Sequence, residues 1–96
     1  MAEVIWSPEA LQDLEDIAAF IARDSEYKAA LFVQRLIEAT DRLADFPDSG
    51  RVIPEVGASR FREVIEGGYR IMYSVSSGQV RIDAVLHGAR RFGRGR

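Results

Sequence analysis

The sequence RFREVIEGGYRIMYSVSSGQVRIDAVLH, residues 60–87, alternates apolar and polar side chains and is interrupted twice by glycine. Such alternation is typical of strands with one buried face, and Gly67-Gly68 and Ser77-Gly78 suit the two-residue turns of β-hairpins. We therefore predict three consecutive antiparallel strands, over residues 60–66, 69–76 and 79–87.

The two turns also predict which side chains share a face of this sheet, because strand residues alternate between its faces. We predict that one face is the buried core, made of Tyr69, Ile71, Tyr73, Val75, Val80, Ile82, Ala84 and Leu86. The opposite face then presents Phe61, Glu63, Ile65, Arg70, Met72, Ser74, Arg81, Asp83, Val85 and His87.

Two amphipathic helices precede these strands, after a short strand-like opening at residues 3–6. Ser7 and Pro8 suit the N-cap and first position of a helix that keeps its apolar spacing to about Arg23. A second helix begins after Asp24-Ser25 and ends at the segment 46–50, and residues 47–59 form a loop. The predicted fold class is α+β, with an N-terminal antiparallel helical hairpin packed on an antiparallel sheet.

Length and composition bound the class of protein. The 96 residues, 47% of them hydrophobic, predict one globular domain spanning residues 1–96. The absence of cysteine excludes disulfides and thiolate sites and suits the cytoplasm. A single histidine and scattered carboxylates predict no metal site and no cofactor. No apolar run approaches about 18 residues, so we expect neither a membrane span nor a signal peptide.

The net charge of −2 hides a division along the chain. Residues 1–48 hold eleven acidic and four basic residues, whereas residues 49–96 hold four acidic residues and nine arginines. This division predicts either an electropositive working face or simple attraction between acidic helices and a basic sheet. The tail, residues 88–96, is basic and broken by glycine, so we predict that it is flexible.

The predicted outer face of the sheet is the strongest candidate site. Arg70, Arg81 and His87 would converge there with Glu63 and Asp83, and a histidine beside arginines can act as a general acid or base. The alternative is that these residues are ordinary charge pairs on an exposed sheet. Two further features have simpler interpretations: Trp6 as a packed aromatic residue, and the acidic side chains of the first helix as a solvated stripe (Glu9, Asp13 and Asp16).

Five segments, in this order and spacing, together resemble one known family. They are SPEALQDLEDI with FIA (residues 7–17 and 20–22), LADFP with Gly50-Arg51 (43–47 and 50–51), RFR (60–62), YRIMY (69–73) and VLHGARR (85–91). The pattern, which covers nearly the whole chain, resembles the ParE/RelE family of bacterial toxins. The resemblance implies the toxin of a type II toxin–antitoxin pair that forms a hetero-oligomer with its antitoxin.

The family has two known activities, and the resemblance implies one of them. RelE-like members cleave mRNA on the ribosome, whereas ParE-like members poison DNA gyrase and are not nucleases. In the RelE-like alternative, Arg62, Arg70 and His87 would be the catalytic residues. The ending His-Gly-Ala-Arg-Arg, the single lysine and the net charge of −2 favour the ParE-like branch.

The ParE-like interpretation implies a ParD-like antitoxin as partner and DNA gyrase as target, with DNA contacted only through the antitoxin and no membrane partner. We predict that the antitoxin contacts the helical hairpin and reaches the basic C-terminal strand. The predicted residues for binding target or antitoxin are Arg81, His87, Arg90, Arg91 and Phe92.

Overall fold

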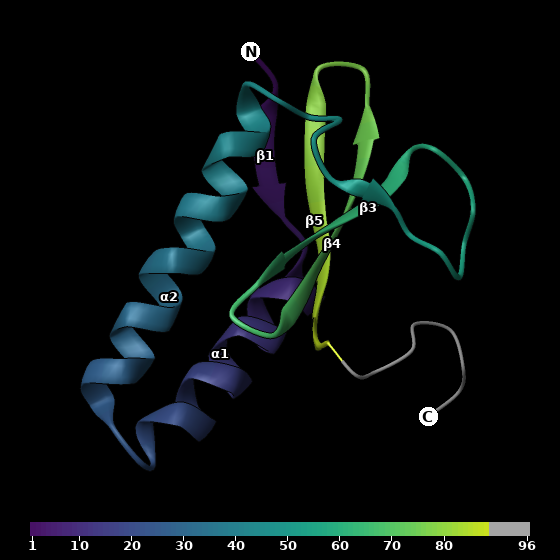
Figure 1. The fold of residues 1–96 in the computed structure, drawn as a ribbon. Helices are drawn as coiled ribbons and strands as arrows, with labels where there is room; N and C mark the ends of the chain where they lie inside the picture. The colour runs from purple at the N-terminus through teal and green to yellow at the C-terminus, as the bar shows by residue number, and fades with distance from the viewer. Residues whose placement is uncertain (89–96) are drawn as a thin grey trace.

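The computed structural model describes residues 1–88 (Figure 1). Its elements are β1 (Glu3–Trp6), α1 (Pro8–Ala22), α2 (Glu26–Asp41), the 3₁₀ turn η1 (Arg42–Ala44), β2 (Arg51–Val52), β3 (Phe61–Glu66), β4 (Tyr69–Ser76) and β5 (Gln79–His87). The predicted helical hairpin and the three consecutive strands are confirmed, and the fold is α+β.

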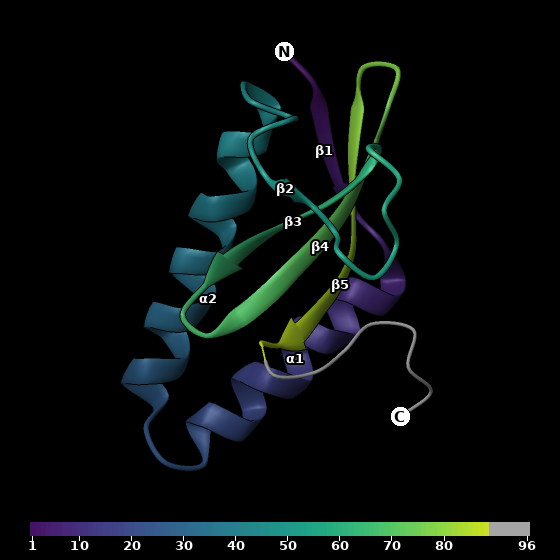
Figure 2. The ribbon, with the colours of Figure 1, turned by 45° about the vertical axis from the view of Figure 1, so that its right-hand side comes forward.

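Both helices begin at the serines that the sequence indicates. The Ser7 hydroxyl accepts a hydrogen bond from the Ala10 N–H at 2.9 Å, and the Ser25 hydroxyl accepts one from the Lys28 N–H at 3.1 Å. Each serine thus satisfies one of the N–H groups that a helix leaves unpaired at its start. Both helices lie on one side of the sheet, as Figures 1 and 2 show.

The sheet is mixed, with strand order β1-β5-β4-β3-β2. The prediction of a wholly antiparallel sheet is wrong at one edge, because β1 pairs with β5 in parallel. Parallel neighbours need a long crossover connection, and here the helical hairpin and three strands lie between β1 and β5 in the chain. The predicted loop, residues 47–59, also contains the two-residue strand β2, which pairs with β3.

The core lies between the helices and the sheet. It is formed by Ala10, Leu36, Ala39, Leu43, Ile71, Tyr73, Val80, Ile82 and Val85. Trp6 is partly buried and packs against this cluster, so its interpretation as a packed aromatic residue is confirmed.

The predicted assignment of side chains to the two faces of the sheet is wrong for the last residues of β5, because this strand contains a β-bulge. Tyr73 pairs with Ile82, as the turn at residues 77–78 requires, but Met72 pairs with Ala84, so Asp83 is an extra residue. Beyond this point every side chain of β5 changes face. Val85 therefore enters the core and His87 lies opposite Tyr69, whereas Ala84 and Leu86, predicted to be core residues, lie on the other face with Met72 and Arg70.

Two side chains from the start of α1 hold the bulge. The Ser7 hydroxyl donates a hydrogen bond to the Asp83 carbonyl oxygen at 3.3 Å, and the Val85 N–H donates one to Asp13 Oδ2 at 2.9 Å. These bonds satisfy backbone groups at the irregularity in the sheet ladder. Asp13 therefore stabilises the sheet by accepting a backbone hydrogen bond. Its interpretation as part of a solvated stripe is wrong.

Tyr73 joins the sheet to the segment before β2. Its hydroxyl donates a hydrogen bond to the Pro47 carbonyl oxygen at 2.7 Å and accepts one from the Gly50 N–H at 2.9 Å. A Cβ atom on Gly50 would lie 2.6 Å from both the Tyr73 hydroxyl oxygen and the Glu63 carbonyl oxygen, so only glycine fits there.

Replacing Asp13 with alanine should destabilise the fold, because the Val85 N–H then loses its acceptor at the bulge. We expect the free energy of unfolding to fall by about 1–2 kcal/mol. Urea denaturation of the two proteins at pH 7 measures this difference. The matched control is Asp16→Ala on the same helix, since Asp16 is exposed and accepts a hydrogen bond from Gln12 of the same helix. Equal losses from both substitutions would contradict a role for Asp13 at the bulge.

Tyr73→Phe should change how stability depends on alkaline pH. Burial raises the pKa of Tyr73 above its ordinary value of 10.0, so the folded state retains the phenol proton after the unfolded state has released it. The free energy of unfolding of the wild type should therefore fall as the pH rises above 10, and Tyr73→Phe should remove this contribution. The variant should also lose about 1–3 kcal/mol at pH 7, since the Pro47 and Gly50 backbone groups lose their partner.

Denaturation curves at pH 7, 9, 10 and 11 give the stability of each protein. Tyr27→Phe is the control for removal of a tyrosine hydroxyl, because Tyr27 is 77% exposed and this substitution should leave the stability at pH 7 unchanged. An alkaline slope in Tyr73→Phe as steep as in the wild type would contradict the assignment.

Candidate functional site

Four charged side chains form a cluster on the sheet face away from the helices, which we call the arginine cluster: Arg51, Glu55, Glu63 and Arg70. Glu63 and Arg70 are its buried members, whereas the Arg51 side chain is 61% exposed. Arg70 Nε donates a hydrogen bond to Glu63 Oε1 at 2.6 Å, and Arg51 Nε donates one to Glu63 Oε2 at 2.6 Å. The two Nη atoms of Arg70 donate to the two carboxylate oxygens of Glu55, at 2.9 and 2.8 Å. All three guanidinium nitrogens of Arg70 therefore donate hydrogen bonds to carboxylate oxygens.

Burial makes this pairing obligatory. The side chains of Glu63 and Arg70 are 0% and 6% exposed, and isolated charges are costly at such depth. The hydrogen bonds to Glu55 raise the pKa of Arg70 above its ordinary value and, with those to Glu63, outweigh burial, which alone would lower it. Arg70 is a permanent cation that the protein itself neutralises.

Arg62 does not belong to the arginine cluster and contacts the segment before β2 instead. Its Nη1 atom donates hydrogen bonds to the carbonyl oxygens of Gly50 at 2.9 Å and Asp48 at 3.3 Å, and its Nε lies 3.7 Å from Asp48 Oδ1. Arg62 thus fastens the segment before β2 to β3, which is a structural role.

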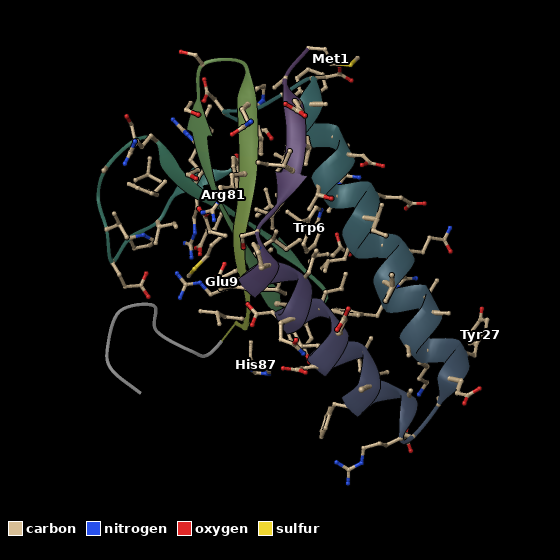
Figure 3. All side chains as sticks on the ribbon, turned by 180° about the vertical axis from the view of Figure 1, so that it is seen from behind. Met1, Trp6, Glu9, Tyr27, Arg81 and His87 are labelled. Carbon is tan, nitrogen blue, oxygen red and sulfur yellow. The ribbon has the colours of Figure 1, made fainter. Side chains whose placement is uncertain are left out.

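His87 lies on the helix side of the sheet because of the bulge. Its ring meets that of Tyr69 edge to face, with centroids 5.6 Å apart. Together they border a pocket of about 320 Å³ against α1, lined also by Asp13, Asp16, Ile17, Phe20, Val85 and Leu86. Figure 3 shows His87 beside α1, at a different height along β5 from Arg81.

Arg81 lies on the sheet face that carries Arg70. Its Nη1 donates to Asp83 Oδ1 at 2.8 Å, and its side chain is 48% exposed. Arg81 and Asp83 border a groove of about 610 Å³, whose apolar wall comes from Ile53, Val56, Phe61, Met72, Val75 and Ala84. We call this feature the sheet groove.

The structure thus separates the residues proposed for nuclease chemistry. The prediction that His87 converges with Arg70 and Arg81 is wrong, because the bulge turns His87 to the opposite face. Arg62 and Arg70 are held by acidic or carbonyl groups. Arg90, Arg91 and Phe92 lie outside the described residues. Within residues 1–88, no group of three or more His, Cys, Asp or Glu side chains is arranged to hold a metal ion.

Sequence reasoning missed Arg51 and Glu55 as members of the cluster. Both belong to the segment assigned to a loop, where no periodicity indicates a facing direction. The available signal was Arg70 itself: an arginine on a strand between apolar residues needs carboxylate partners from a neighbouring segment.

Most of the net positive charge of residues 49–96 belongs to residues 89–96 and not to the sheet. Residues 49–88 contain five arginines and four acidic residues, a net charge of +1, whereas residues 89–96 contain four arginines and no acidic residue. Four of the five sheet-region arginines are in ion pairs: Arg51, Arg62, Arg70 and Arg81. The described sheet is therefore not an electropositive face. Within residues 1–88, no helix is both long and apolar enough to cross a membrane.

Comparison with known proteins agrees with this fold. The chain is 37% identical over 91 residues to Toxin RelE2 of Caulobacter vibrioides, which covers 94% of this chain and 99% of that relative. Its fold matches a solved structure of the chromosomal ParDE TA system from P. aeruginosa with a TM-score of 0.74, over 91% of this chain and 96% of that chain. The identity to that structure is 20%, so this likeness concerns the fold alone.

A family model described as the ParE toxin of the type II toxin–antitoxin system parDE matches residues 4–92. The match spans almost the whole chain and includes every described helix and strand from Val4 onward. The resemblance seen in the sequence is thereby confirmed, and the chain belongs to the ParE family of toxins of type II toxin–antitoxin systems.

Proposed function

We propose that this ParE-family toxin poisons DNA gyrase and is neutralised by a ParD-like antitoxin. The observation that carries the proposal is the placement of Arg62, Arg70 and His87. Cleavage of RNA requires cationic groups and an acid or base around one phosphate. Here the two arginines are bound by the protein's own acceptors, and His87 lies on the opposite face of the sheet from Arg70.

The charge distribution supports the same branch. Binding to ribosomal RNA depends on neutralising phosphates with many lysines and arginines. The chain has a net charge of −2 and one lysine, Lys28. Since the described part of the second half has a net charge of only +1, the sheet offers little attraction to a phosphate backbone.

Antitoxin binding is proposed along the helical hairpin and β5, with Arg81, His87, Arg90, Arg91 and Phe92 as contacts. Arg81 and His87 are exposed, and Phe20 on α1, which lines the pocket beside His87, is 66% exposed. Exposed aromatic and arginine side chains are common anchors at protein interfaces. An acidic antitoxin segment would also complement the four arginines of residues 89–96.

Two purified assays separate the gyrase target from the ribosome. The toxin should abolish supercoiling by gyrase and leave broken DNA, while mRNA on translating ribosomes stays intact. Toxin mixed beforehand with the product of the adjacent antitoxin gene is the control, and it should leave gyrase active. In cells, expression without antitoxin should induce the DNA-damage response before protein synthesis falls.

One set of results would contradict the gyrase proposal. Rapid arrest of translation with mRNA cut at ribosomes and intact DNA would overturn the gyrase proposal and favour the RelE-like alternative. His87→Ala would then be the decisive variant, because loss of cleavage would show that His87 acts as a catalytic residue despite its separation from Arg70.

Removing residues 89–96 should weaken antitoxin binding, because four arginines are lost while Gly88 keeps its bond to the Gly68 carbonyl oxygen. We expect an affinity loss of about tenfold or more from the loss of four positive charges. Calorimetry at low and moderate salt measures it, and the loss should shrink as salt increases. A full-length chain with the four arginines replaced by lysine is the charge-matched control. Undiminished affinity of the truncated chain would contradict the role of the tail.

A further inference from the structure

The loop between β2 and β3, residues 53–60, lies across the sheet face away from the helices (Figure 2). Two of its side chains reach inward: Ile53, which is 2% exposed, and Glu55, whose side chain is 18% exposed. Residues 54–60 are otherwise exposed, and the loop contains Gly57 at a φ of 77°. Backbone hydrogen bonds tie both ends of the loop to the strands, from the Ile53 N–H to the Phe61 carbonyl oxygen and from the Val75 N–H to the Arg60 carbonyl oxygen. Between these ends, Ile53 and Glu55 are the side chains that contact the sheet face.

The members of the arginine cluster differ in how firmly they are placed. Glu63 belongs to β3, is fully buried and is shared by Arg51 and Arg70. Glu55, by contrast, comes from the loop and meets the forked end of Arg70 with two parallel hydrogen bonds. This fork geometry is the one that arginine uses to bind a carboxylate from another molecule.

The same loop also borders the sheet groove. Ile53 and Val56, on either side of Glu55 in the chain, line this groove together with Met72 and Ala84. A segment that lifted the loop would therefore meet an apolar surface on the sheet face that carries Arg70. That combination suits a peptide in which an acidic residue is flanked by apolar ones.

We propose that the forked end of Arg70 is a binding site for a carboxylate side chain of a partner protein, and that Glu55 occupies this site as an intramolecular stand-in. The cluster without Glu55 has two arginines and one glutamate, so a single negative charge restores neutrality. A phosphate of a nucleic acid would bring further negative charge close to Glu63. The apolar groove also favours a protein over a nucleic acid.

Exchange of one carboxylate for another keeps Arg70 neutralised throughout. Withdrawal of Glu55 alone would leave a buried guanidinium without two of its acceptors, which is strongly unfavourable. Loop opening is therefore coupled to the arrival of a replacement carboxylate. Glu55 makes the site selective, because a partner without a correctly placed acidic residue cannot displace it.

Chemical rescue of Glu55→Ala by acetate tests the site. Loss of the charged pair should lower the Tm by about 5–15 °C. Acetate should restore much of this loss by filling the vacated position, with no effect on the wild type. The Nε–H signal of Arg70 in ¹⁵N-resolved spectra should shift with acetate in the variant alone. Glu55→Gln, which keeps the side-chain size, provides the same measurement if Glu55→Ala does not fold.

Glu66→Ala is the matched control, because it removes an equal charge from the same sheet outside the cluster. Its Tm should not respond to acetate. Chloride at equal ionic strength should rescue neither variant. No response of Glu55→Ala to acetate, or stronger rescue by inorganic phosphate than by acetate, would overturn the carboxylate site.

Displacement by a partner is tested with a capped peptide that places one glutamate between leucines. It should bind Glu55→Gln at least about tenfold more tightly than the wild type, because the internal competitor is gone. The counterpart with glutamine in place of glutamate should lose this preference. Equal binding of both peptides would overturn the proposal. Neither result depends on gyrase, so the gyrase assay can fail independently.

Discussion

Two hydrogen bonds from the start of α1 to the bulge of β5 determine how the two faces of the sheet differ. The Ser7 hydroxyl and the Asp13 carboxylate satisfy backbone groups of Asp83 and Val85. Since the side-chain period of a strand is two, one extra residue reverses every later position. The bulge therefore places Val85 in the core and His87 against α1, and it leaves the opposite face to Arg70, Met72 and their partners.

That opposite face is stabilised by charge as well as by apolar packing. Ile53 and Met72 are almost fully buried there, beside Glu63 and Arg70. Buried ion pairs add little net stability when complete, but loss of one partner leaves an uncompensated buried charge and destabilises the fold. The loop carrying Glu55 is thereby fixed to the sheet by an electrostatic requirement. This requirement adds to the backbone hydrogen bonds of Ile53 and Arg60 that tie the ends of the loop to the strands.

The sequence was informative where a local rule decided the structure. Alternation and the glycine turns predicted β3, β4 and β5, and Ser7 and Ser25 predicted the helix starts, because these signals depend on neighbouring residues. The parallel pairing of β1 and the bulge at Asp83 depend on contacts between residues more than 70 positions apart. No periodicity in β5 reveals the acceptor that Asp13 supplies. The same limit applies to Glu55, whose partner Arg70 lies beyond a turn and a strand.

The charge division of the chain acquires a different meaning once ion pairs are assigned. An average over residues 49–96 suggests a basic sheet, but residues 49–88 have a net charge of only +1. Within that described range, Arg60 stacks on Phe61 at 4.6 Å instead of forming a salt bridge. Residues 89–96 contain the other four arginines and no acidic residue, so most of the net positive charge of residues 49–96 belongs to them. The proposed antitoxin would first be attracted to these arginines through an acidic segment, whereas the proposed carboxylate site at Arg70 acts only at contact distance, after Glu55 has been displaced.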